Sequence, residues 1–230
     1  MISVCMATYN GEKYLEEQLK SIIFQLNPTD EIIISDDGST DNTLDLVKKY
    51  QDKFSNIKFI NGPQKGVVKN FENAINFAKG DIIFLCDQDD IWYENKVEIV
   101  LKYFENKDTY LILHDANIVN CFGEKIENSF FQHRHSKKGI IRNIWKNSYL
   151  GCCMAFRKEV IRKALPFPEK IEMHDWWLGI ITEKYWSTYL ITDKLIGYRR
   201  HGNNVSSFHH HPLKKMLINR IYIIYKLLMR

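Results

Sequence analysis

Short apolar runs alternate with helical patterns over residues 1–104. The runs at 2–8, 31–35, 57–60 and 81–86 are rich in Ile, Val and Phe and are bounded by polar turns, which predicts buried strands. Between them, apolar residues recur at spacings of three and four, as in Leu15, Leu19 and Ile22, which predicts amphipathic helices. This repetition predicts an α/β fold with a mostly parallel central sheet and helices on both faces.

The pattern beyond this region is less regular. Residues 109–119 and 146–156 are predicted strands, the stretch from 174 to 186 is a predicted helix, and 187–201 predicts one or two strands. No low-complexity linker or internal repeat divides the chain. We therefore expect one domain over residues 1–205, followed by a basic amphipathic helix within 206–230.

Polar clusters follow three of the predicted strands. They are TYNG after the first strand, DDGSTD after the second and DQDD after the fourth. Ligands of parallel α/β sheets bind at the carboxyl ends of the strands. We therefore expect these three loops to meet at one edge of the sheet and to form one site.

The DQDD cluster is the strongest chemical signal. Asp87, Asp89 and Asp90 repel one another unless a positive group lies among them. Oxygen ligands suit Mg²⁺ or Mn²⁺, and such a cation could also hold a diphosphate. The alternative is a helix N-terminus, where acidic residues are favourable.

The other two clusters are open to two interpretations. Tyr9 and Asn10 could stack on and hydrogen-bond a nucleobase, and Asp37 could accept hydrogen bonds from a base or a ribose. A turn followed by a helix cap explains the same letters. The shared sheet edge favours the binding interpretation.

Two later motifs are candidates for chemistry. Asp175, in HDWW, could be a general base whose pKa is raised by its aromatic surroundings, or a helix N-cap. His201, in YRRHGNN, could complement the carboxylates as a metal ligand, or lie in a solvated turn.

Composition narrows the function classes. Lys and Arg number 32 against 28 Asp and Glu, and the resulting charge of +4 does not imply a nucleic-acid partner. The five cysteines are odd in number and lie mostly in apolar stretches, which favours a reducing cytosol. We expect no signal peptide and no membrane-spanning helix.

Two segments are basic and free of acids. Residues 133–146 predict a solvated loop or a flap that meets a phosphorylated ligand. The helix pattern within 212–230 interleaves basic and apolar residues, which fits peripheral contact with an anionic membrane. Packing against its own domain or a partner subunit is the alternative.

With these residues the chain resembles the family 2 glycosyltransferases of the GT-A fold, whose central sheet is Rossmann-like. The resemblance rests on seven motifs in order: SVCMATYNG, IIISDDGSTDNT, GVVKNFENA, FLCDQDD, GCCMAF, HDWW and YRRHGNN. Each is weak alone, but together they cover roughly residues 1–205. DQDDIW, HDWW and YRRHGNN are most similar to the bacterial branch that transfers rhamnose and related sugars in surface-polysaccharide assembly.

The resemblance implies roles for particular residues. Asp89 would be the metal ligand, His201 a further one, and Asp175 the base that deprotonates the acceptor hydroxyl. This chain has His174 before Asp175 where the family often has Glu, and Lys69 where the family often has Arg, which loses the bidentate fork. The implied nucleotide-sugar-binding residues are Thr8, Tyr9, Asn10, Asp37, Lys69, Asn70 and Asp87.

The implied reaction is metal-dependent inverting transfer, with Mn²⁺ or Mg²⁺ as cofactor. The expected donor is a nucleotide-diphospho-sugar, with dTDP-rhamnose favoured and a UDP-hexose as the alternative. The expected acceptor is a lipid-linked growing glycan at the inner face of the cell membrane. Less favoured are an aspartyl-phosphate phosphatase, for which Ile91 departs from the motif, and a non-catalytic nucleotide-sugar-binding subunit. A dinucleotide oxidoreductase is also disfavoured, because no GxGxxG signature follows any predicted strand.

Overall fold

The first four strands form the parallel part of the sheet. The computed structural model describes residues 1–202, 204 and 212–230. The strands are adjacent in the order β3-β2-β1-β4 and every pair among them is parallel, as predicted. The residues of β1, β2 and β4 are almost all buried because helices cover both faces, whereas in the edge strand β3 only Ile57 is buried. Their bounds are β1 (Ile2–Thr8), β2 (Glu31–Asp36), β3 (Ile57–Asn61) and β4 (Ile82–Asp87).

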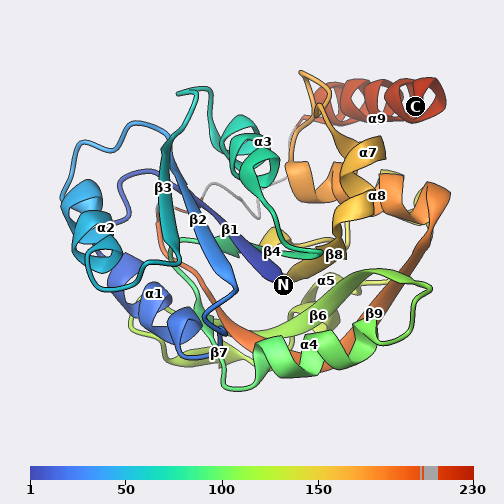
Figure 1. Ribbon diagram of the computed structural model, residues 1–230. Coiled ribbons are helices and arrows are strands. Elements are labelled where there is room, and N and C mark those ends of the chain that lie inside the picture. Colours follow the sequence, from blue (N-terminus) through green and yellow to red (C-terminus); the bar gives the residue numbers. More distant parts are fainter. Residues whose placement is uncertain (203, 205–211) are drawn as a thin grey trace.

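Helices alternate with these strands and lie on opposite sides of them. The helices α1 (Leu15–Ile23) and α2 (Thr43–Gln51) lie on one face, and α3 (Val67–Phe77) lies on the other (Figure 1). This placement follows from right-handed crossovers, because the chain first steps outward to β3 and then returns to β4. The helix α4 (Lys96–Phe104) follows β5 (Ile91–Trp92).

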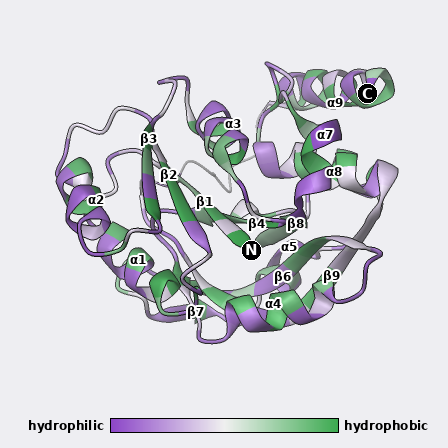
Figure 2. Cartoon of the chain, viewed as in Figure 1, coloured by the Kyte–Doolittle hydropathy of each residue, from purple (hydrophilic) through white to green (hydrophobic). Residues whose placement is uncertain are grey.

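The second half extends the sheet with mixed strands. The order continues β4-β8-β6-β9-β5, and β7 pairs with β6. Only β6 and β9 are parallel there; β8 runs antiparallel to both β4 and β6. The whole is therefore a curled α/β sheet whose hydrophobic residues line the strands and the inward sides of the helices (Figure 2). The bounds are β6 (Thr109–Val119), β7 (Lys125–Glu127), β8 (Met154–Arg157) and β9 (Ser187–Arg199).

The strand predicted over 146–156 is wrong for most of its length. Gly151–Cys153 form a short 3-10 turn, η1, and the strand itself is only β8. The basic stretch 133–146 is also more ordered than expected, because α5 (Phe130–Arg134) ends within it and α6 (Ile140–Trp145) lies inside it. The remaining elements are η2 (Lys158–Val160), α7 (Ile161–Ala164), α8 (His174–Tyr185) and α9 (Leu213–Met229).

The expected boundary between the domain and the C-terminal helix stays a prediction. Residues 205 and 206 lie outside the described part of the chain, as does Asn203 of the YRRHGNN motif. Within the described residues no helix is long and apolar enough to cross a membrane.

Candidate active site

A cavity of about 1310 Å³ opens where the carboxyl ends of β1, β2 and β4 meet. The start of α8 and the residues after β9 close its other side. Nine of the ten residues to which the family resemblance gave roles line it: Thr8, Tyr9, Asn10, Asp37, Asn70, Asp87, Asp89, Asp175 and His201. Residues far apart in the chain therefore share one cavity, as the positions of the polar clusters predicted.

Lys69 is the exception. It is absent from the cavity lining and instead pairs with Glu72 at 2.7 Å and donates to the Phe167 carbonyl. Lys69 and Asn70 are neighbours on α3, and consecutive helical residues point in different directions. Since Asn70 faces the cavity, Lys69 lies on the flank of the helix.

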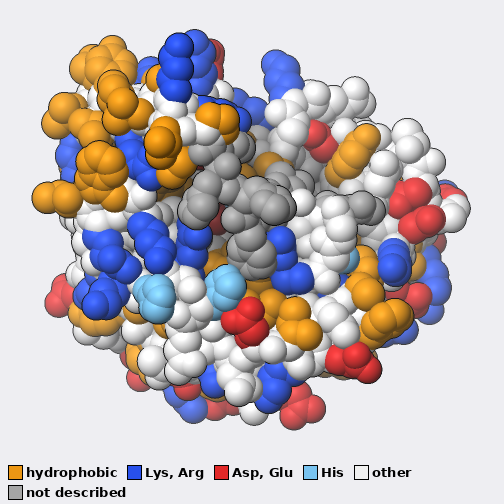
Figure 3. Space-filling view, turned by 180° about the vertical axis from the view of Figure 1, so that it is seen from behind, with side chains coloured by type: hydrophobic (Ala, Val, Ile, Leu, Met, Phe, Trp, Pro, Cys, Tyr) orange, Lys and Arg blue, Asp and Glu red, His pale blue; other side chains and the backbone are white. Residues whose placement is uncertain are grey.

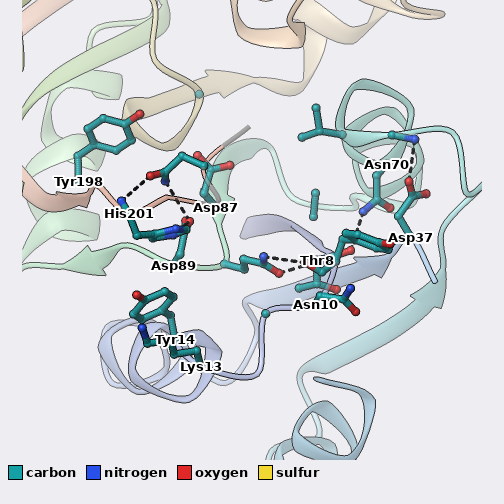
Figure 4. A pocket seen from close by; sticks show the side chains of 18 of the residues that line it. Thr8, Asn10, Lys13, Tyr14, Asp37, Asn70, Asp87, Asp89, Tyr198 and His201 are labelled. Carbon is teal, nitrogen blue, oxygen red and sulfur yellow. Dashed lines mark hydrogen bonds and ion pairs between the residues drawn. The ribbon is translucent and has the colours of Figure 1, made fainter. Parts of the chain in front are cut away.

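The cavity has two ends. Figure 4 shows them as two separate groups of labelled side chains. The first group, at the ends of β1 and β2, contains Thr8, Asn10, Asp37 and Asn70, and the second, beyond β4 and β9, contains Asp87, Asp89, Tyr198 and His201. We call these the β1–β2 end and the β4–β9 end.

Two acceptor oxygens at the β1–β2 end have no hydrogen-bond partner among the described residues. Asn70 donates through Nδ2 to the carbonyls of Thr8 and Ser35, at 3.2 and 2.8 Å, and leaves Oδ1 unpaired. Asp37 accepts the Gly66 amide at 2.7 Å through Oδ2 and leaves Oδ1 unpaired. Buried acceptors without a donor are costly, so this end is suited to a ligand that carries N–H or O–H groups.

Gln88 joins the loops after β1 and β4. Its side chain accepts from the Tyr9 amide and donates to the Tyr9 carbonyl, each at 3.0 Å. A Cβ at Gly11 would come within 2.2 Å of Gln88 Oε1, so the glycine leaves the space that this pair needs. The Tyr9 ring remains exposed beside the cavity. Gln88 was not among the predicted site residues, although it lies inside DQDD.

Asp89 and His201 meet at the β4–β9 end. Asp89 Oδ2 lies 2.7 Å from His201 Nε2, although the residues are 112 positions apart. Asn204 donates to the same oxygen at 3.3 Å. The Tyr14 ring stacks on His201 with ring centroids 4.9 Å apart, which fixes the plane of the imidazole.

Arg199 holds this end together and was not expected from the sequence. Its side chain is buried and donates through Nε to the Asp89 carbonyl at 2.7 Å. It pairs with Glu17 at 2.5 Å, and its guanidinium lies 4.8 Å from the centre of the Tyr14 ring. The doublet in YRRH gave no signal of this role, because the Glu17 partner lies 182 residues away.

Asp90, the third carboxylate of DQDD, holds the turn after β4 against β9. Asp90 accepts the Arg199 amide through Oδ1 at 2.9 Å and thereby ties the turn to β9. Burial, followed by the charge of Asp89, raises the pKa of Asp90 to about 7. Burial and the neighbouring carboxylates likewise raise the pKa of Asp87 well above its usual range. Burial and the mutual repulsion of the carboxylates therefore both favour the protonated forms of Asp87 and Asp90. The helix N-terminus alternative is wrong, because β5 follows the cluster and α4 begins later, at Lys96.

The donor set at this end fits a hard or borderline divalent cation. Asp89 offers carboxylate oxygen, His201 offers imidazole nitrogen, and the two ligand atoms lie within reach of one ion. A second group, Asp87, Asp90 and Cys152, has ligand atoms within 4.8 Å of one another. The Asp89–His201 pair is the better fit for Mn²⁺ or Mg²⁺, because the second group is the more buried and includes a thiol.

Asp175 lies in the first turn of α8, where the N-cap is Met173. It accepts the Gly151 amide at 3.0 Å and the Trp176 amide at 2.5 Å. Burial raises the pKa of Asp175 to about 6, and the two amides oppose that rise. The direction agrees with the sequence-based expectation, and the carboxyl changes its charge close to neutral pH.

His174 beside it is neutral and almost fully buried, and it lines the cavity. Burial lowers the pKa of His174 to about 3, and its ring stacks on Phe71 with centroids 4.0 Å apart. Neither ring nitrogen has a partner among the described residues, and a Cβ at Gly151 would come within 2.9 Å of Nε2. The structure therefore adds a neutral donor and acceptor next to the Asp175 carboxylate.

Comparisons with known proteins agree with this arrangement. The family model "Glycosyl transferase family 2" matches residues 3–165. A dTDP-rhamnosyl transferase of Shigella flexneri, RfbG, is 32% identical over 86% of this chain and 72% of its own length. An Escherichia coli relative, WfgD, named a UDP-Glc:alpha-D-GlcNAc-diphosphoundecaprenol beta-1,3-glucosyltransferase, is 26% identical over 94% of this chain and 83% of its own.

The fold has solved counterparts. Residues 1–349 of Staphylococcus aureus TarS, crystallised in complex with UDP-GlcNAc, superpose with a TM-score of 0.74 at 21% identity. The superposition covers 98% of this chain and 66% of the TarS chain. The protein thus spans slightly less than two thirds of that structure, and the likeness identifies the fold.

Proposed function

Because the chain belongs to glycosyl transferase family 2, we propose that it transfers a sugar, with inversion, from a nucleotide-diphospho-sugar to a hydroxyl of a growing surface glycan. One observation carries the proposal: Asp37, Asp89 and Asp175, which come from three separate segments, line one cavity. Family membership also makes the phosphatase and oxidoreductase alternatives unnecessary.

The β1–β2 end is the place we assign to the nucleobase. Asp37 and Asn70 each present a buried acceptor oxygen, and the imide N–H of a uracil or thymine base could donate to one of them. The exposed Tyr9 ring could stack on the base, with Thr8 and Asn10 beside it. Asp87, at the β4–β9 end beside Asp89, is the residue we assign to the ribose.

The β4–β9 end is the place we assign to the diphosphate. Asp89 and His201 are the residues that would hold Mn²⁺ or Mg²⁺. When bound, such a cation neutralises charge on the leaving diphosphate. The Arg199 contact with the Asp89 carbonyl and the Tyr14 stack on His201 keep both ligands in place.

Asp175 is the residue we assign as general base. The acceptor hydroxyl gives its proton to the Asp175 carboxylate while its oxygen attacks the anomeric carbon. The bond from that carbon to the diphosphate oxygen breaks, and its electron pair leaves with the nucleotide diphosphate. A raised pKa suits this task, because a base titrating near the working pH transfers protons efficiently.

For the donor we favour dTDP-rhamnose, because RfbG is named a dTDP-rhamnosyl transferase. A UDP-sugar is the alternative, supported by the names of WfgD and the TarS complex. The name of WfgD also supports a lipid-linked acceptor. All five cysteines are free, which fits work in the reducing cytosol.

The test is a nucleotide-release assay with dTDP-rhamnose, UDP-glucose and UDP-GlcNAc, each with Mn²⁺, with Mg²⁺ and with a chelator. We expect release from one donor, dependent on metal and lost in Asp175→Asn. Release that is equal with and without chelator would remove the metal from the scheme. Tight donor binding without turnover under any condition would favour a non-catalytic nucleotide-sugar-binding subunit.

A further inference from the structure

The helix α9 has one anchored face and one open face. Ile223 and Leu227 are 2% and 8% exposed and pack against the domain. Lys184 donates to the Leu227 carbonyl at 2.6 Å, and Arg230 donates to the Leu165 carbonyl at 2.7 Å. The helix therefore packs on its own domain, which was one of the alternatives for this segment, and its orientation is fixed.

The open face of α9 is apolar instead of polar. An ordinary surface helix turns charged and polar residues outward. Here the outward residues between its ends are almost all large and apolar (Figure 3). They are Leu213, Leu217, Ile218, Ile221, Ile224, Tyr225, Leu228 and Met229.

The helix α6 extends this face. Arg220 of α9 donates to the Trp145 carbonyl at 2.7 Å, and its guanidinium lies 5.2 Å from the centre of the Trp145 ring. Trp145 and Ile141 are themselves 60% and 77% exposed. We call the exposed apolar residues of the two helices the α6–α9 surface.

Basic residues surround the α6–α9 surface. No Asp or Glu occurs from 128 to 158 or from 194 to 230. The exposed cationic residues within or next to α6 and α9 in the sequence are Lys137, Lys138, Lys146, Lys214 and Lys215. Two acids face the same elements: Glu172 accepts from Asn219 of α9, and Glu183 accepts the Gly139 amide before α6.

We propose that the α6–α9 surface lies on an anionic lipid membrane, with its apolar side chains at the boundary between headgroups and acyl chains and its lysines among the headgroups. An apolar helix face bordered by Lys and Arg is the chemistry that such an interface binds. A second copy of the chain is the weaker candidate, because a two-fold contact would bring the same basic residues against each other.

The surface is also connected to the proposed active site. Trp176 follows Asp175 and donates through Nε1 to the Asn143 carbonyl of α6 at 2.7 Å. One helix therefore separates the proposed base from the membrane-facing surface. This consequence, unlike the membrane contact itself, rests on the proposed function, and it suits an acceptor that is anchored in the bilayer.

The test is vesicle flotation with the whole chain. Vesicles of phosphatidylcholine alone are compared with vesicles of phosphatidylcholine and phosphatidylglycerol in equal parts. We expect the protein to float with the anionic vesicles only and to be released at high salt. Ile221→Glu should reduce the bound fraction about tenfold or more, because it places a charge in the apolar stripe. Phe24→Glu is the matched control: Phe24, at the end of α1, is 87% exposed and should tolerate the change without loss of binding.

Two further measurements keep the proposal falsifiable if Ile221→Glu does not fold. The double variant Lys214→Glu/Lys215→Glu changes only exposed side chains at the start of α9 and should also abolish flotation. Brominated lipid should quench Trp fluorescence in the natural protein and much less in Trp145→Phe. Failure to bind anionic vesicles overturns the proposal. So does a dimer in sedimentation experiments that Ile221→Glu converts to monomer, because the surface would then be a self-interface. Neither result depends on turnover.

Discussion

The two ends of the cavity are built by different means. The β1–β2 end consists of adjacent parallel strand ends, and its side chains are tied by neutral hydrogen bonds such as those of Asn70 and Gln88. The β4–β9 end gathers ionisable groups from distant segments, with Asp89 held by His201 and by Arg199. The pKa values of Asp87 and Asp90 are raised there, and so is that of Asp175 at the start of α8. We infer that the first end sets donor affinity, whereas the ionisable groups set the rate and its dependence on pH.

The largest effect should come from Asp175→Asn. If Asp175 is the base, kcat should fall by about 10²–10⁴ while donor affinity changes little. Turnover is measured by nucleotide release and donor affinity by calorimetry. Asp108→Asn, on the exposed turn before β6, is the control and should leave both unchanged. A kcat within about tenfold of the natural protein would remove Asp175 from the mechanism.

A smaller loss should follow removal of the metal ligand. Asp89→Asn should reduce metal-stimulated turnover by about a hundredfold and raise the Mn²⁺ concentration needed for half-maximal rate. The measurement is a metal titration of nucleotide release for both proteins. An unchanged metal requirement in the variant would move the cation to another group, for which the Asp87, Asp90 and Cys152 cluster is the next candidate.

The β1–β2 end should respond in affinity and not in rate. Asp37→Ala removes a buried acceptor and should raise the donor KM by about tenfold to a hundredfold with little change in kcat. Lys69→Gln is the matched comparison, because Lys69 pairs with Glu72 outside the cavity. It should change KM by less than about threefold. A large effect of Lys69→Gln would mean that donor binding moves α3.

The smallest effect, though the most diagnostic for the reacting groups, concerns pH. Burial raises the pKa of Asp175 to about 6, so the carboxyl is mostly in its ionised, basic form only above that pH. We expect kcat to fall about tenfold for each pH unit below it. Donor affinity should change less over the same range, because the Asn70 amide, one of the two unpaired acceptors at the β1–β2 end, does not titrate. A kcat flat down to pH 4 would contradict the assigned base.

Local sequence pattern was sufficient for the parallel half of the fold. The strands and helices up to α4 each have a period or a turn that depends on nearby residues alone, and the structure confirms the sheet they form. The apolar run at 150–156 predicted a longer strand than the structure has, because contacts with residues distant in the chain determine the conformation at Gly151. Gly151 gives its amide to Asp175 instead of to a neighbouring strand, and the lack of a side chain leaves room for His174.

The candidate site was predictable where residues follow strand ends. It was not predictable where a residue acts through distant partners, as Arg199 does with Glu17 and Tyr14. No spacing in the chain encodes such contacts. Lys69, expected from its motif to bind the nucleotide-sugar, is instead absent from the cavity lining and pairs with Glu72, a contact that the motif does not indicate.

The order in which the cavity walls occur along the chain has a consequence for synthesis. The loops after β1, β2 and β4 are complete by residue 90, but Asp175 and His201 come much later. Residues 3–165, which the family description spans, end before either of them. A nascent chain therefore contains Asp89 and Asp90 well before His201 and Arg199, their hydrogen-bond partners, have been synthesised. Until then the growing polypeptide lacks the residues that would complete the cavity, including the proposed base Asp175.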